Sequence, residues 1–197
     1  MPVDFPYTLD EMMPNFLYRD LAQEGFVSLG VLYFSQTPSP GRNPESFLDA
    51  PLSAVKEAKP TWVESIEDGV RFLRALVGVA SEPIALVGWS LGAWVALHCA
   101  ASGKYAALVL ISPWLPPGEE IHDLAKGLPP TLVLHGTADD IVPTSVSHHI
   151  GSVLEEAGTL VEVKEVVDGT HLWTGEEGDQ AFASIVEFLK LYLSPAA

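Results

Sequence analysis

Short apolar runs alternate with longer segments of helical periodicity along this chain of 197 residues. A run of four to eight apolar residues between turn residues is typical of a buried strand, whereas apolar residues at intervals of three and four are typical of an amphipathic helix. Strands that alternate with helices fold into a mostly parallel sheet covered by helices on both faces, which is a three-layer α/β architecture. The predicted strands are residues 26–34, 84–87, 106–111, 130–134 and 160–167.

The first third of the chain gives weaker signals. Residues 9–24 have helical periodicity, and residues 35–60 are rich in proline, serine and asparagine, which predicts a long loop. Thr61 and Glu64 then match a capping box, in which each side chain bonds the backbone N–H of the other residue. We therefore expect a helix to begin at Thr61 and to carry its apolar stripe as far as Val77.

The later helices are marked more clearly. Residues 91–102 and 179–193 carry apolar stripes, and the helix that Thr144 caps is expected to end at Gly158. The strand at 160–167 alternates charged residues with valines, which is typical of a sheet edge. The length suits one domain, so we expect residues 1–197 to form a single α/β unit.

Composition excludes several classes of function. The formal net charge is −16, which argues against nucleic acid and anionic membranes as partners, because both bind basic surfaces. A single cysteine excludes an intramolecular disulfide, and no apolar run is long enough to span a membrane. Residues 1–10 lack the basic and apolar regions of a signal peptide. We therefore expect a cytoplasmic protein, as a monomer or a homodimer.

The segment Gly88-Trp89-Ser90-Leu91-Gly92 lies between a predicted strand and a predicted helix. This context is the one that a nucleophile elbow requires, because the serine must stand on a tight strand-to-helix turn and glycines let the backbone pack closely around it. The turn also directs the first amides of the helix toward a reacting oxygen. The pattern predicts Ser90 as a catalytic nucleophile and the Leu91 amide as an oxyanion-hole donor.

A serine hydroxyl needs a base to become a good nucleophile, and in this fold the acid and the histidine follow the serine along the chain. Asp139 and Asp140 follow the strand at 130–134, and His171 follows the strand at 160–167. Because the carboxyl ends of parallel strands meet at one edge of a sheet, Ser90, an aspartate and His171 can converge there. His135 is expected to support the acid loop.

These motifs resemble those of the α/β-hydrolase superfamily, and within it the small dienelactone hydrolase-like carboxylesterases. The similarity includes Arg19–Val27, the segment from His135 to Pro143 with the pattern His-Gly-x-x-Asp-x-x-Val-Pro, and the Gly-x-His turn at His171. In that family the first aspartate of the pattern is the catalytic acid, so the resemblance implies Asp139 rather than Asp140. It also implies catalysis without a metal or an organic cofactor.

The chain departs from the family in two ways. Dienelactone hydrolases have cysteine at the elbow, whereas this chain has Ser90, which favours ordinary esters or thioesters over lactones. The family also has an early strand that ends in a His-Gly motif and supplies the second oxyanion amide, and no obvious copy is found here. That second donor is left to the N-terminal segment, near Tyr7 or Thr8.

Three tryptophans, Trp89, Trp114 and Trp173, each follow or end a predicted strand. Together they could form an aromatic rim for an apolar acyl or alcohol group. The connection after residue 111 has room only for a short helix within 119–126, which predicts an open site with no large cap and a small ester as substrate. A thioesterase or a lactonase would share every catalytic residue, and a non-catalytic relative with an incomplete oxyanion hole is the alternative from a different class.

Overall fold

The computed structural model describes residues 15–33, 52–76, 78–79, 81–173 and 175–193. The chain divides into two compact units, residues 1–65 and 66–197. Within the described residues, every strand lies in the larger unit. The smaller unit contributes helix α2 (Asn15–Gln23) and the first part of helix α4 (Leu52–Ala75).

The larger unit is built on a four-stranded parallel sheet in the order β1-β2-β3-β4. The strands are β1 (Ala85–Trp89), β2 (Ala107–Ile111), β3 (Thr131–Gly136) and β4 (Val161–Val166). Every residue of β2 and β3 is buried, as expected for central strands that are covered on both faces. β4 is largely half-buried, and it pairs with β3 alone among the described strands, so it has the predicted features of an edge strand. All four strands lie within two residues of their predicted ends.

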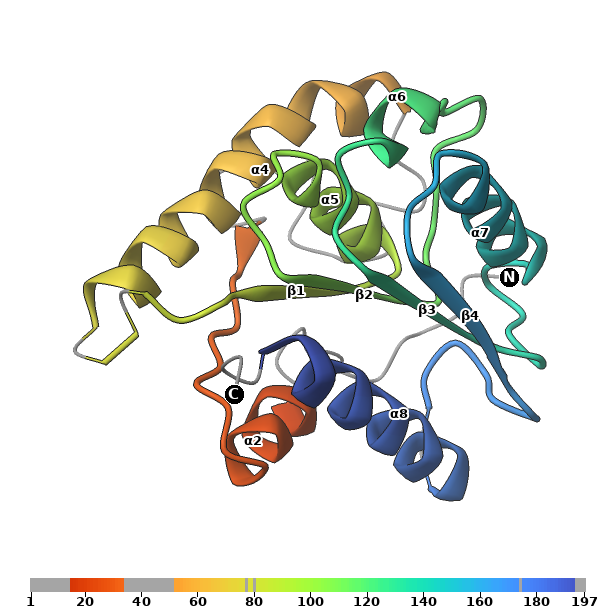
Figure 1. Ribbon diagram of the computed structural model, residues 1–197. Coiled ribbons are helices and arrows are strands. Elements are labelled where there is room, and N and C mark those ends of the chain that lie inside the picture. The colour runs from red at the N-terminus through yellow and green to blue at the C-terminus, as the bar shows by residue number, and fades with distance from the viewer. Residues whose placement is uncertain (1–14, 34–51, 77, 80, 174, 194–197) are drawn as a thin grey trace. The chain divides into compact units, whose positions relative to one another are not determined.

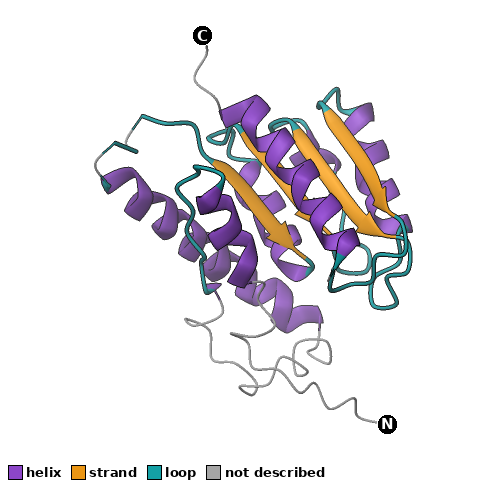
Figure 2. Cartoon of the chain, turned by 90° about the horizontal axis from the view of Figure 1, so that it is seen from below, coloured by secondary structure: helices purple, strands orange, loops and turns teal. Residues whose placement is uncertain are grey.

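Helices cover both faces of this sheet (Figure 2). Helix α5 (Leu91–Ala100) and helix α7 (Ser145–Glu156) lie on one face, and helix α8 (Glu176–Leu193) lies on the other (Figure 1). Helix α5 is apolar on nearly all sides, which explains why seven of its ten residues are buried. The connection between β2 and β3 contains only the short helix α6 (His122–Ala125) and therefore no large cap. The predicted three-layer α/β architecture is confirmed.

The prediction of a strand at residues 26–34 is wrong, because residues 26–33 form no ladder with any described strand. Gly25 ends helix α2 in the left-handed region (φ 93°), and the Phe26 amide donates back to the Leu21 carbonyl. The segment then leaves Val27 62% and Leu32 60% exposed. Apolar and β-branched residues indicated a strand here, but no described strand pairs with this segment, so among the described residues its backbone groups have no ladder to join.

The prediction of a loop at residues 35–60 is also wrong in its last part, because α4 begins at Leu52. Alanine, lysine and glutamate dominate residues 52–59, and these are strong helix formers whose signal was obscured by the prolines around them. Pro60 lies inside the helix, and Thr61 is not a capping residue but an interior one. Its carbonyl accepts a bond from the Ser65 hydroxyl at 3.0 Å.

Candidate active site

Ser90 stands on the tight turn that joins β1 to α5. Its backbone adopts φ 53° and ψ −121°, a conformation that residues other than glycine rarely adopt. The Ser90 amide donates to the Ile111 carbonyl at 2.9 Å, and its own carbonyl accepts from the Trp114 amide at 3.2 Å. A Cβ atom on Gly88 would lie 2.5 Å from the Gly92 carbonyl oxygen, so only glycine fits there. This is the geometry of a nucleophile elbow.

Leu91 is the first residue of α5. The amides of the first helical turn have no partner within their helix, so they are available to bind a negatively charged oxygen. The Leu91 amide, which is the predicted oxyanion donor, therefore follows Ser90 directly in the chain and lies at the positive end of the helix dipole. The other predicted donors, Tyr7 and Thr8, lie outside the described residues.

Asp139 and His171 meet at the carboxyl ends of β3 and β4. The His171 Nδ1 lies 2.8 Å from Asp139 Oδ2, and because a carboxylate only accepts, Nδ1 carries the hydrogen. The Asp139 side chain is fully buried, and that of His171 is 8% exposed. Asp140, the alternative acid, is exposed and is not the carboxylate that contacts His171.

Backbone amides fix the other oxygen of Asp139. Oδ1 accepts from the Ile141 amide at 2.9 Å and from the Val142 amide at 2.8 Å. Burial alone would raise the pKa of this carboxyl, but the bonds from Val142, His171 and Ile141 and the attraction of the imidazole outweigh it. The pKa of Asp139 therefore lies below its ordinary value, and the group is a carboxylate at neutral pH.

Two glycines bring the acid loop against the base loop. A Cβ atom on Gly136 would clash with the carbonyl of Gly169, and the Ala138 amide donates to that same carbonyl at 2.9 Å. The Asp168 amide donates to the Thr137 hydroxyl at 2.9 Å. Asp168 itself occupies a turn with φ 58°, as expected of a residue in a tight loop. The short distance between His171 and Asp139 thus depends on a close backbone approach.

Ser90 and His171 are linked through Trp89. The Trp89 indole Nε1–H donates to the His171 carbonyl at 3.2 Å, and the Trp89 ring lies 5.1 Å from the imidazole. No hydrogen bond joins the Ser90 hydroxyl to His171 in the described part of the chain. In enzymes without a bound substrate this contact is often long, and it tightens only in the complex. Ser90, Asp139 and His171 follow β1, β3 and β4, so they belong to the same edge of the sheet.

The three tryptophans predicted as a rim have different surroundings. All three are half-buried. Trp114 packs edge-to-face against Trp94 of α5, with ring centroids 6.3 Å apart. The indole N–H of Trp173 is buried and has no hydrogen-bond partner among the described residues. Trp89 contacts His171 directly, and the substrate-binding role of all three tryptophans remains a prediction.

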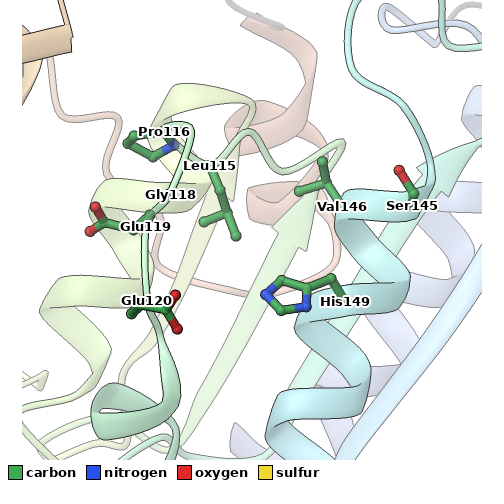
Figure 3. Close-up of a pocket in the computed structure, with 8 residues that line it drawn as sticks. All are labelled: Leu115, Pro116, Gly118, Glu119, Glu120, Ser145, Val146 and His149. Carbon is green, nitrogen blue, oxygen red and sulfur yellow. The ribbon is translucent and has the colours of Figure 1, made fainter.

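A surface pocket of about 310 Å³ lies between the connection after β2 and the start of α7 (Figure 3). The Trp114 amide, next to Leu115 in the chain, donates to the Ser90 carbonyl, and the Val146 amide donates to the Pro143 carbonyl, but Ser90, Asp139 and His171 are not among the lining residues. Sequence reasoning missed this pocket because its lining comes from one loop and the first turns of α7, which carry no motif. The lining residues are Leu115, Pro116, Gly118, Glu119, Glu120, Ser145, Val146 and His149.

The described residues contain neither a candidate metal cluster nor a candidate membrane-spanning helix. No group of three or more histidine, cysteine, aspartate or glutamate side chains there could hold a metal ion. In the same part of the chain, no helix combines the length and the apolar character that a membrane span needs.

Comparison with known proteins gives one family and a common fold. The family model described as phospholipase/carboxylesterase matches residues 51–193. A search of curated proteins gives no significant match.

Similar solved structures include several esterases. Est1E from Butyrivibrio proteoclasticus is 16% identical, with a TM-score of 0.59, and the alignment covers 70% of this chain and 72% of that one. A protein of unknown function from Agrobacterium tumefaciens, described as an α/β hydrolase, is 20% identical with a TM-score of 0.61, over 92% of this chain and 78% of its own. Esterase PE8 is 23% identical with a TM-score of 0.54, over 69% of this chain and 62% of its own. At these identities the likeness shows the fold, which is that of the α/β hydrolases.

Proposed function

The chain belongs to the phospholipase/carboxylesterase family of carboxylic ester hydrolases, and we propose that it cleaves esters with Ser90 as nucleophile, His171 as general base and Asp139 as orienting acid. The observation that supports this most strongly is the 2.8 Å hydrogen bond between His171 Nδ1 and Asp139 Oδ2. Because Nδ1 carries the hydrogen, the neutral imidazole has its lone pair on Nε2, the nitrogen that can take a proton from a serine.

The reaction proceeds in two halves. The Ser90 oxygen attacks the ester carbonyl while His171 Nε2 takes the hydroxyl proton, and the buried Asp139 carboxylate stabilises the imidazolium that forms. The same proton is then given to the leaving alcohol, which leaves an acyl group on Ser90. A water molecule next gives a proton to His171 and attacks the acyl carbonyl. Collapse of this second intermediate returns the proton to Ser90 and releases the carboxylic acid.

The negative charge on the carbonyl oxygen needs hydrogen-bond donors near Ser90. The Leu91 amide is suited to this role because it begins α5 directly after the nucleophile. Losing one such donor typically costs about 3 kcal/mol in the transition state. The second donor remains assigned, as a prediction, to the region of Tyr7 and Thr8.

We assign small or short-chain acyl esters as the substrate class. The connection between β2 and β3 contains only the four-residue helix α6, so the described residues there form no large lid. The pocket of about 310 Å³ between the connection after β2 and the start of α7 is not lined by Ser90, Asp139 or His171, so this assignment rests on the short connection.

A series of p-nitrophenyl esters tests this assignment. Acetate, butyrate and octanoate are offered to the wild type and to Ser90→Ala, and the variant is expected to lose at least about a thousandfold in kcat/KM. The wild type is expected to prefer acetate or butyrate over octanoate. Matched thioesters and lactones in the same assay separate an esterase from a thioesterase or a lactonase. Equal, negligible turnover by wild type and variant on every substrate would reject the proposal and favour a binding role.

A further inference from the structure

His135, the penultimate residue of β3, occupies a position that the reaction above does not use. Its imidazole is fully buried, with a side chain only 1% exposed. Buried imidazoles normally have partners at both ring nitrogens, and His135 does. Its Nε2 lies 2.8 Å from the Val142 carbonyl oxygen and its Nδ1 lies 2.6 Å from the Ser147 hydroxyl.

The partners of His135 determine where its proton is. Nε2 faces the Val142 carbonyl at 2.8 Å and the Asp139 Oδ2 at 3.2 Å, and neither group has a hydrogen to give. Nε2 must therefore carry the hydrogen in the neutral ring. Nδ1 then has the lone pair, and the Ser147 hydroxyl, which can donate, satisfies it.

This arrangement holds Asp139 from two directions. Both backbone polar groups of Val142 are hydrogen-bonded, since its amide donates to Asp139 Oδ1 at 2.8 Å and its carbonyl accepts from His135 Nε2. The His135 Nε2–H also lies beside Oδ2, the oxygen that accepts from His171. Ser147 is a buried residue of α7, so the chain of contacts ties the carboxylate to a helix that packs on β3 and β4.

We propose that His135 is a positioning residue for the reaction, which fixes Asp139 through its Nε2–H and thereby sets the orientation of His171. This proposal rests on the proposed function only for its effect on turnover. Its structural content is a single tautomer of His135 and a fixed Asp139 carboxylate. Loss of the Nε2 donor leaves the Val142 carbonyl without its donor and Oδ2 without the neighbouring His135 N–H, so Asp139 is held less tightly against His171 and turnover falls while substrate binding does not.

Paired amide substitutions distinguish positioning from simple packing. In His135→Gln the side-chain amide nitrogen reaches about as far as Nε2, whereas in His135→Asn it reaches only about as far as Nδ1. We expect His135→Asn to lower kcat about tenfold to a hundredfold with little change in KM, as leaving a buried carbonyl without its donor produces. We expect His135→Gln to recover most of this loss. His148→Gln is the matched control, because His148 contacts the Glu165 carboxylate on the surface of the same larger unit, with its side chain 56% exposed.

NMR supplies a readout that a packing role would not change. The proton between His171 Nδ1 and Asp139 is expected to give a low-field resonance that is retained in His135→Gln and His148→Gln and shifts or broadens in His135→Asn. Equal damage in the Asn and Gln variants, or wild-type kcat in His135→Asn, overturns the proposal. If His135→Asn does not fold, the ¹⁵N shifts of the wild-type ring decide, since an Nδ1–H tautomer contradicts the proposal and an Nε2–H tautomer supports it. Failure of Ser90→Ala to abolish turnover would reject the proposed function instead, and the tautomer measurement would still test His135.

Discussion

Replacing Asp139 by asparagine tests the orientation of the base, and the structure predicts its consequence atom by atom. Oδ1 accepts from two backbone amides, so the carbonyl oxygen of the new side chain must take that place. The NH₂ group then faces His171 Nδ1, which lies 2.8 Å away and carries a hydrogen in the wild type. Two donors cannot share this contact, so His171 changes tautomer and its hydrogen moves to Nε2.

An imidazole with its hydrogen on Nε2 cannot accept the proton of Ser90. We therefore expect kcat on p-nitrophenyl acetate to fall by about 10⁴, or about 5.5 kcal/mol, as the same exchange produces in serine proteases. Asp140→Asn is the matched control, because Asp140 is adjacent in the chain, exposed and not the partner of His171. It should retain activity within about twofold. A loss smaller than tenfold in Asp139→Asn, with the protein folded by circular dichroism, would refute the reasoning, and a large loss in Asp140→Asn would move the acid to that residue.

Three further predictions concern the loops around the site. Gly136→Ala places a methyl group against the Gly169 carbonyl. The free energy of unfolding, measured by urea denaturation, should fall by about 3 kcal/mol, and turnover should fall with it. An unchanged urea midpoint would contradict the close approach of the two backbones. Trp89→Phe keeps an aromatic ring but removes the bond to the His171 carbonyl, which should lower kcat about fivefold at constant KM, and a wild-type kcat would show that this bond does not position the base. The folded-state pKa of Asp139 is below its ordinary value, so its carboxylate stabilises the fold above that ordinary pKa, and the stabilisation is lost as pH falls through the folded-state value. The difference in unfolding free energy between wild type and Asp139→Asn should therefore narrow from pH 5 to pH 3, and a constant difference would contradict the sign.

The larger unit followed from its sequence because each local signal agreed with the sheet. The runs that became β2 and β3 are continuously apolar, as strands covered on both faces must be, and the alternation in β4 identified the edge. The glycines around Ser90 and the motif around Asp139 lie where close backbone approach or a tight turn requires them. Such positions can be predicted from the sequence because very few residue types fit the backbone conformation or the space there.

In the smaller unit only helix α2 followed from the sequence, since it lies within the helix predicted over residues 9–24. Residues 26–33 have the apolar composition of a strand, but a strand also needs another strand to pair with. Composition contains no information about that pairing strand. Residues 52–60 show the opposite error, since prolines nearby concealed strong helix formers. In the site, the contacts of Trp89 with His171 and of His135 with Ser147 join residues far apart in the chain or on different elements. No local spacing predicts contacts of this kind.

Covalent labelling tests the central claim most directly. A fluorophosphonate probe reacts with a serine that a neighbouring base activates, because it mimics the carbonyl that the serine attacks. Intact-mass and peptide analysis should find one adduct per chain, on Ser90, formed much more slowly in His171→Ala and absent in Ser90→Ala. Absence of an adduct, or an adduct on another residue that persists in Ser90→Ala, would contradict the assignment of Ser90 as the nucleophile.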